Sequence, residues 1–154
     1  MPSLTEVRDA AVTLLQTVFP DLPRVEAFSG EITIGAVADK RLPAGVSVLV
    51  ASLAADNDAA PGSLDFDVVA SFGVLIISSN AAGAEYAEAD ALSVAETAAL
   101  SIHGATFGLP VSPARVKSLE AVNDETFVEN GYSVWTFVWQ QQLIFTERNT
   151  DESV

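Results

Sequence analysis

The sequence predicts a single α+β domain in which two helices pack on a mainly antiparallel sheet. Its 154 residues are the usual length of one domain. Two segments carry apolar residues at helical spacing, and five are rich in β-branched or aromatic residues. The predicted order is helix, three strands, helix, two strands, over residues 1–147, followed by a polar, flexible tail at 148–154.

The first helix is predicted over Leu4–Val18. Ser3 and Glu6 stand in an S-x-x-E capping box, and apolar residues follow at helical spacing. Two prolines, at positions 20 and 23, end the helix because proline lacks the backbone N–H that a helix needs. Residues 24–28 are then predicted to form a short strand.

Two longer strands are predicted in the middle of the chain. The first begins at Gly45 with alternating valines and ends in an acidic loop of small residues, Ala54–Gly62. The second, Leu64–Ser78, alternates at first, so one of its faces is polar. Its end, Val74–Ile77, is apolar on both faces, which is typical of a sheet covered on both sides.

The second helix is predicted to be capped by Ser79 or Asn80 and to stop at Gly104. Its apolar stripe is mostly alanine, which allows close packing on a sheet. The residues of this stripe are Leu92, Ala95, Ala99 and Ile102.

The last two strands, Ala114–Val122 and Tyr132–Phe145, are predicted to pair as a hairpin. Both faces of the final strand carry bulky side chains. We expect its aromatic face to fill the core, and a platform that stacks bases or sugars is the alternative. The aromatic face holds Trp135, Phe137, Trp139, Leu143 and Phe145, and the opposite face holds Tyr132, Val134, Thr136, Val138, Gln140, Gln142 and Ile144.

Composition excludes several classes of function. The formal charge is −14, with 21 acidic and 7 basic residues, which argues against a surface that binds nucleic-acid phosphates. The absence of cysteine excludes disulfides and thiolate metal sites. No apolar run reaches the roughly 18 to 20 residues of a membrane-spanning helix, and the N-terminus lacks the features of a secretory signal.

No motif in the sequence predicts catalysis or cofactor binding. His103 is the only histidine, and we expect it to be a helix-end residue. The segment GATFGLP at 104–110 lacks the lysine of a phosphate-binding loop. We therefore expect no enzymatic activity and no cofactor.

Acidic residues offer two weak candidates for a site. Residues 56–58, Asp-Asn-Asp, begin like a calcium loop, but Ala60 stands where a further ligand is needed, so a solvated turn and no metal is expected. Asp65 and Asp67 alternate on one strand face and could form a carboxylate pair like that of a glycosidase. We interpret this pair as part of a solvent-exposed face.

The C-terminal part of the chain carries three features of a known family. These are FGLPV at Phe107–Val111, the segment PARV at Pro113–Val116, and YSVWTFVWQQ at 132–141. Together they resemble the C-terminal half of the tail-completion, or tail terminator, proteins of Mu-like phages.

This resemblance implies an α+β subunit of a hexameric ring that caps the finished tail tube and joins it to the head. The implied partners are further copies of the chain, the tail tube protein and the head–tail connector, with DNA only as passing cargo. The implied location is the head-proximal end of the virion tail, after assembly in the host cytoplasm. Residues Asp65, Asp67, Gln140 and Gln142 are expected at a subunit contact or the lumen.

Three alternatives remain open at this stage. Another head–tail connector or stopper protein would share the same features. A small carboxylate-dependent enzyme would use Asp65, Asp67 or Glu120. A small-molecule binding module would rest on the aromatic strand alone.

Overall fold

The structure is a computed structural model, and it describes residues 3–28, 45–57, 66–79, 84–122 and 132–145. Its element order confirms the predicted α+β class and the predicted succession of helices and strands. The elements are α1 (Leu4–Val18), β1 (Arg24–Ala27), β2 (Gly45–Asn57), β3 (Phe66–Ser79), α3 (Ala84–Ile102), β4 (Arg115–Ala121) and β5 (Tyr132–Phe145).

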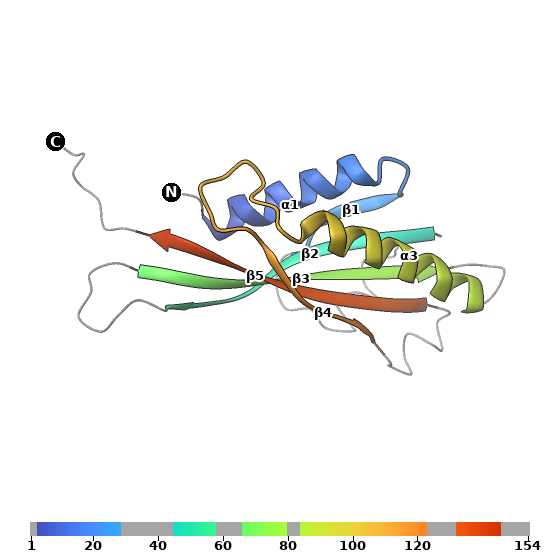
Figure 1. Cartoon of the computed structure of the whole chain (residues 1–154). Helices are drawn as coiled ribbons and strands as arrows, with labels where there is room; N and C mark the ends of the chain where they lie inside the picture. Colours follow the sequence, from blue (N-terminus) through green and yellow to red (C-terminus); the bar gives the residue numbers. More distant parts are fainter. Residues whose placement is uncertain (1–2, 29–44, 58–65, 80–83, 123–131, 146–154) are drawn as a thin grey trace.

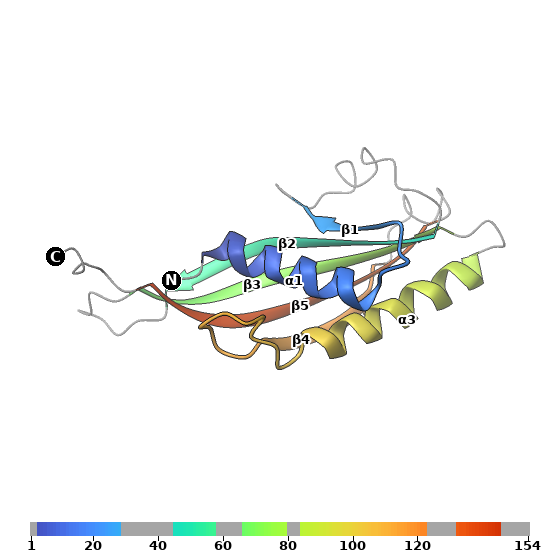
Figure 2. The same ribbon diagram turned by 90° about the horizontal axis from the view of Figure 1, so that it is seen from above.

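The five strands form one sheet in the order β1-β2-β3-β5-β4. Strands β1 and β2 are parallel, whereas the other neighbours pair antiparallel. Both helices lie on the same side of this sheet (Figure 1), and the view from above shows α3 near β4 and α1 over β2 and β3 (Figure 2). We call the side that the helices cover the helix face and the opposite side the far face.

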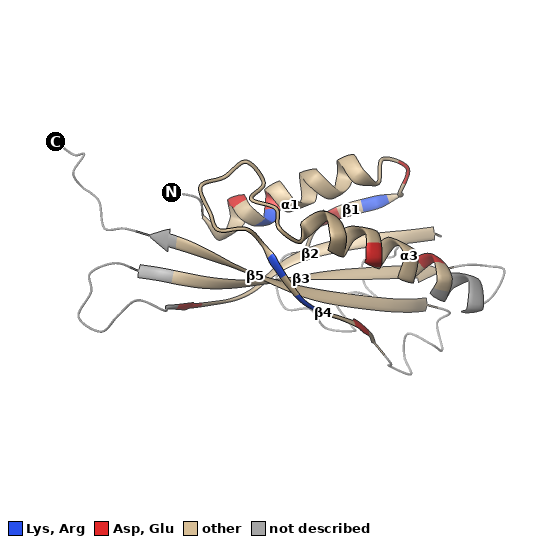
Figure 3. Ribbon diagram, viewed as in Figure 1, with Lys and Arg blue, Asp and Glu red and all other residues tan. Residues whose placement is uncertain are grey.

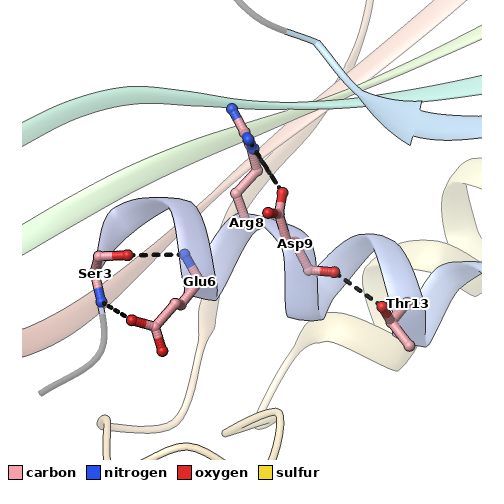
Figure 4. Close-up of polar contacts among 5 residues, drawn as sticks. All are labelled: Ser3, Glu6, Arg8, Asp9 and Thr13. Carbon is pink, nitrogen blue, oxygen red and sulfur yellow. Dashed lines mark hydrogen bonds and ion pairs between the residues drawn. The ribbon is translucent and has the colours of Figure 1, made fainter.

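Local sequence signals account for α1. The Ser3 hydroxyl accepts a hydrogen bond from the Glu6 backbone N–H at 3.1 Å, and the Ser3 N–H donates to the Glu6 carboxylate at 3.3 Å (Figure 4). These two bonds satisfy backbone groups that a helix start leaves unpaired. Arg8 and Asp9 form an ion pair at 3.1 Å on the surface of the same helix. The predicted capping box is therefore confirmed.

The main core lies between the helices and the helix face of the sheet. Its largest fully buried side chains are Phe72, Phe137 and Trp139, packed beneath α1 and α3. The rings of Phe72 and Trp139 are stacked, with centroids 4.8 Å apart. This arrangement confirms that the aromatic face of β5 fills the core.

The far face carries a second cluster of buried apolar side chains. It comprises Phe28, Leu49, Ala51, Leu75, Ile77 and Val134. The prediction that the end of β3 is apolar on both faces is therefore confirmed, because Val74 and Ile76 belong to the core on the helix face.

The structure corrects two details of the predicted elements. Strand β2 continues to Asn57, beyond the predicted end at Ala54, because β3 pairs with it along the whole length and supplies its hydrogen bonds. Ser79 belongs to β3, where it pairs with Tyr132, so it does not cap α3. Asn80 and the loop residues 58–62 lie outside the described residues.

The buried stripe of α3 differs from the predicted one at two positions. Ala95 and Ile102 are buried as expected, but Leu92 and Ala99 are only half-buried. From residue 89 onward, where the side chains of α3 are described, the fully buried positions are Ala91, Ala95, Ala98 and Ile102. The helix is therefore rotated so that alanines face the sheet and Leu92 lies at the edge of the contact.

Candidate functional site

The sequence-predicted site residues fall at different places on the sheet. Gln140 and Gln142 lie on the far face of β5, as the alternation predicts. The Gln140 amide donates to the Ser71 hydroxyl of β3 at 3.4 Å, and Gln142 is exposed. Asp67 lies in β3 opposite Ile144, and Asp65 lies outside the described residues.

The pairing register along β5 places Asp67 far from Glu120, the other carboxylate that an enzyme was predicted to use. Glu120 is paired with Thr136, whereas Asp67 is paired with Ile144, eight residues further along β5. A strand rises about 3.3 Å per residue, so these two backbone positions lie roughly 26 Å apart along the sheet. Asp67 and Glu120 therefore do not form a catalytic pair, for which carboxylates must lie within about 10 Å.

His103 has a structural contact that explains its position. It follows the last residue of α3, and its Nδ1 accepts a hydrogen bond from the Val116 backbone N–H at 3.1 Å. This bond ties the end of α3 to β4. Among the described residues, no group of three or more His, Cys, Asp or Glu side chains is placed to hold a metal ion.

Gln141 is a buried polar residue that sequence reasoning missed. Only 2% of it is exposed, on the aromatic face of β5. Its Oε1 accepts from the Trp139 indole N–H at 3.0 Å, and its Nε2 donates to the carbonyls of Ala105 and Ser112 at 3.1 and 2.8 Å. The alternation of side chains along the strand could have revealed it. Gln141 stands two residues after Trp139 and two before Leu143, so it shares their buried face.

The loop that Gln141 holds contains the FGLPV segment. Backbone bonds from Gly104 to Ala114 and from Ala114 to Ala105 close its base, at 2.7 and 2.8 Å. Phe107 has a φ of 57° and its ring lies 6.1 Å from that of Trp139. The segments that carry the family resemblance therefore form one packed unit, in which the loop depends on the side chains of β5.

A groove runs between α3 and β4, next to this unit. Its volume is about 380 Å³, and its lining is mostly apolar. Leu100 is 79% exposed there. The lining residues are Glu96, Ala99, Leu100, His103, Val116 and Leu119.

Two basic residues of β4 precede and follow Val116, but neither lines the groove, and Arg115 pairs with Gln140 on the far face. Arg115 and Lys117 are exposed on either side of Val116 in β4, and neither has an ion-pair partner in the described part of the chain. The other described basic residues, Arg8 and Arg24, lie close to acids of their own elements. Figure 3 shows the two blue positions of β4 among the acidic residues. Among the described residues, the basic side chains without an ion-pair partner therefore both lie in β4.

Comparison with known proteins gives a structural likeness. No protein-family model matches the sequence, and no curated protein matches it. The chain is similar to a chain of a solved structure described as the virion of a native gene transfer agent (GTA) particle, with a TM-score of 0.59 and 14% sequence identity. The match covers 94% of this chain and 100% of that chain, so the two share their fold over nearly their whole length.

Within the described ranges, no helix is both long and apolar enough to cross a lipid bilayer.

Proposed function

We propose that the chain is a structural protein of a phage-type virion, and that it acts as a tail terminator. The observation that supports this most directly is the whole-length likeness to a chain of a gene transfer agent virion. The resemblance of residues 103–145 to the tail terminators of Mu-like phages supports the more specific role. The proposed protein forms a ring, a hexamer by that resemblance, at the head-proximal end of the tail tube.

The charge of the chain suits a ring through which DNA passes. At −14 per subunit, the acidic surface repels phosphates, so DNA can slide past without being held. The proposed partners are further copies of the chain, the tail tube protein and the head–tail connector. Gln140 and Gln142, with Asp65 and Asp67, remain our proposed residues for a subunit contact or the lumen.

A connector or stopper at the same joint is the second candidate function. It is supported by the same structural likeness, because that likeness is to a virion and does not distinguish between the parts of a head–tail joint.

Tube assembly separates the two candidates. We expect substoichiometric amounts of the chain to shorten tubes grown from purified tail tube protein, with rings visible at one tube end by negative-stain microscopy. Native mass spectrometry of the chain alone should show a closed oligomer. Tubes of unchanged length, together with a chain that stays monomeric with and without tube protein, would contradict the terminator role.

A further inference from the structure

We infer that two opposite sides of the sheet meet when copies of this chain assemble. One side is the edge of β2 that points away from β3 over Ala51–Asn57, which we call the bare edge. The other side consists of the loop at 104–113 and the start of β4, which we call the basic side. The inference rests on the proposed ring, in which each copy presents two different surfaces to its two neighbours.

The bare edge is a length of strand with a partner on one side only. Strand β1 pairs with β2 over Ser47–Val50, and the Phe28 N–H donates to the Val50 carbonyl. From Ala51 to Asn57, β2 pairs with β3 alone among the described residues. Every residue of Ser52–Asp56 is exposed. An unpaired strand edge offers backbone donors and acceptors to another chain.

The basic side lies level with the bare edge, across the sheet. Ser112 of the loop donates its N–H to the carbonyl of Gln142, which lies in one row of paired residues with Asp56. Arg115 lies in the next row on the same face, which ends at Ala54. Around a ring axis that runs along the strands, the basic side of one copy would therefore meet the bare edge of the next.

The loop of the basic side is already arranged for contact. Gln141 donates to the carbonyls of Ala105 and Ser112, and residues 104–113 include no charged side chain. A surface that is already ordered loses little conformational entropy on binding. An uncharged surface can also approach another acidic chain without bringing carboxylates together.

Opposite charges lie at the two sides. Asp56 is exposed at the bare edge, and Ala51–Asn57 contains no basic residue. Arg115 and Lys117 are exposed at the basic side, and neither has an ion-pair partner in the part of the chain that the structure describes. Asp56 and Arg115 both lie on the far face, by their pairing with β3 and β5. Copies that meet side by side therefore bring these two side chains together on one face.

Glu120, the acidic residue of β4, lies outside this contact. Its row of paired residues crosses the sheet to Leu49, which is paired with β1. The bare edge begins two residues further along β2, at Ala51. The basic start of β4 is therefore level with the bare edge, and Glu120 is level with the part of β2 that β1 covers.

These charges favour a head-to-tail contact. Two bare edges in contact would bring together the Asp56 carboxylates of both copies, and two basic sides would bring four cations together. Like charges in contact disfavour binding, and contact between unlike sides avoids both cases. Head-to-tail contacts close into rings when the rotation between subunits permits it.

The start of β4 is not free to extend the sheet. The Val116 N–H is bonded to His103, and the ladder is irregular between Val116 and Ser118. A bulge and a lysine are features by which an edge strand avoids pairing with other chains. Side chains and the loop therefore form the contact, without a continuous ladder between copies.

Charge reversal tests the contact. We expect Asp56→Arg and Arg115→Glu each to weaken self-association by about tenfold, because each places like charges at the contact. The double variant keeps the net charge of −14 and should associate like the wild type. An equimolar mixture of the two single variants should recover as well, because every contact in an alternating ring then joins opposite charges. Single variants that neither combination rescues would overturn the inference.

Glu96→Arg separates this contact from the repulsion between whole subunits. It raises the net charge by two units, as Asp56→Arg does, but Glu96 lies exposed on α3. Because repulsion falls, Glu96→Arg should associate at least as well as the wild type. Analytical ultracentrifugation measures association, and circular dichroism verifies the fold of each variant. Equal responses of the two variants would mean that net charge alone acts, and would overturn the inference.

Because the chain has no cysteine, single cysteines give site-specific cross-linking. Ala54→Cys and Ser118→Cys place thiols at exposed positions of the bare edge and of β4. A short bismaleimide should yield covalent dimers in a mixture of the two variants and few with either variant alone. Abundant dimers of Ala54→Cys alone would overturn the head-to-tail arrangement.

The outcomes distinguish this inference from the proposed function. If rings form and shorten tubes, but neither charge reversal weakens association, the contact lies elsewhere and the terminator role stands. A wild-type chain that never associates, even with tube protein, would overturn both.

Discussion

Gln141 links β5 to the loop that carries the FGLPV segment. One side chain satisfies a tryptophan N–H on its own strand and two carbonyls of the loop. Buried polar groups with all their partners in place fix one arrangement of a core, and losing the shared partner removes one hydrogen bond from each group, although the Ala105 carbonyl still accepts from the Ala114 N–H. At this position, a polar side chain therefore determines where an otherwise irregular loop lies.

Replacing Gln141 with methionine tests this role. Methionine has a similar length but forms none of the three hydrogen bonds, so we expect the free energy of unfolding to fall by about 2–4 kcal/mol. Urea denaturation followed by tryptophan fluorescence measures the change. Gln142→Met is the matched control at an exposed position, and we expect it to be neutral within about 0.5 kcal/mol. Equal effects of the two substitutions would contradict the role assigned to Gln141.

Two substitutions of His103 test the hydrogen bond that ties the end of α3 to β4. Its Nδ1 accepts from the Val116 N–H, and the Oδ1 of an asparagine can occupy the same position on the side chain. We expect His103→Ala to lower the free energy of unfolding by about 1 kcal/mol. His103→Asn should keep most of the stability that the hydrogen bond contributes. Hydrogen exchange at the Val116 amide should accelerate in the alanine variant only. An unchanged exchange rate there would show that the bond does not protect this amide.

At the scale of elements, α3 approaches the sheet closely because its buried face is made of alanines. Among the described side chains of α3, the fully buried ones before Ile102 are all alanines, at Ala91, Ala95 and Ala98. Small side chains bring a helix axis nearer to the strands beneath it. Any gain in volume on this face must therefore push α3 away from β3 and β5.

Overpacking variants test the closeness of this contact. We expect Ala98→Leu to lower the free energy of unfolding by about 1–3 kcal/mol, because the extra methyl groups have no space. Ala89→Leu makes the same chemical change at an exposed position of the same helix, where we expect no loss. Thermal denaturation of both proteins gives the comparison. A tolerated leucine at position 98 would mean that α3 can move outward without cost.

Elements with local signals were predictable from the sequence, and those that depend on distant partners were less so. The bounds of α1 follow from Ser3, Glu6 and the prolines, all within a few residues. The end of β2 at Asn57 depends on pairing with β3, and small residues give no strand signal of their own. The contacts of Gln141 join residues 36 and 29 positions apart, which alternation alone cannot reveal.

The candidate site was less predictable than the fold. Gln140 and Gln142 lie on the far face as expected, because a strand alternates strictly. The groove between α3 and β4 could not be foreseen, since it exists only where the end of a helix meets the edge of a sheet. Arg115 and Lys117 have no distinguishing pattern in sequence, and only the folded chain shows that neither has an ion-pair partner among the described residues.

At the scale of the whole molecule, net charge opposes the assembly that we propose. Copies that each carry −14 repel one another at long range, while the contact between neighbouring subunits acts only at short range. Added salt screens distant charges strongly and partly buried contacts much less. Assembly of the ring should therefore strengthen as salt is added, whereas the binding of a basic protein to DNA weakens.

We expect self-association to strengthen as ionic strength rises from about 0.01 M to about 0.15 M, over which the screening length falls from about 30 Å to about 8 Å. Sedimentation velocity at several salt concentrations measures this dependence, with sodium chloride replaced by potassium glutamate as a control for specific ion effects. Association that weakens steadily with salt would instead mean that local attraction at the subunit contact dominates the repulsion between whole subunits.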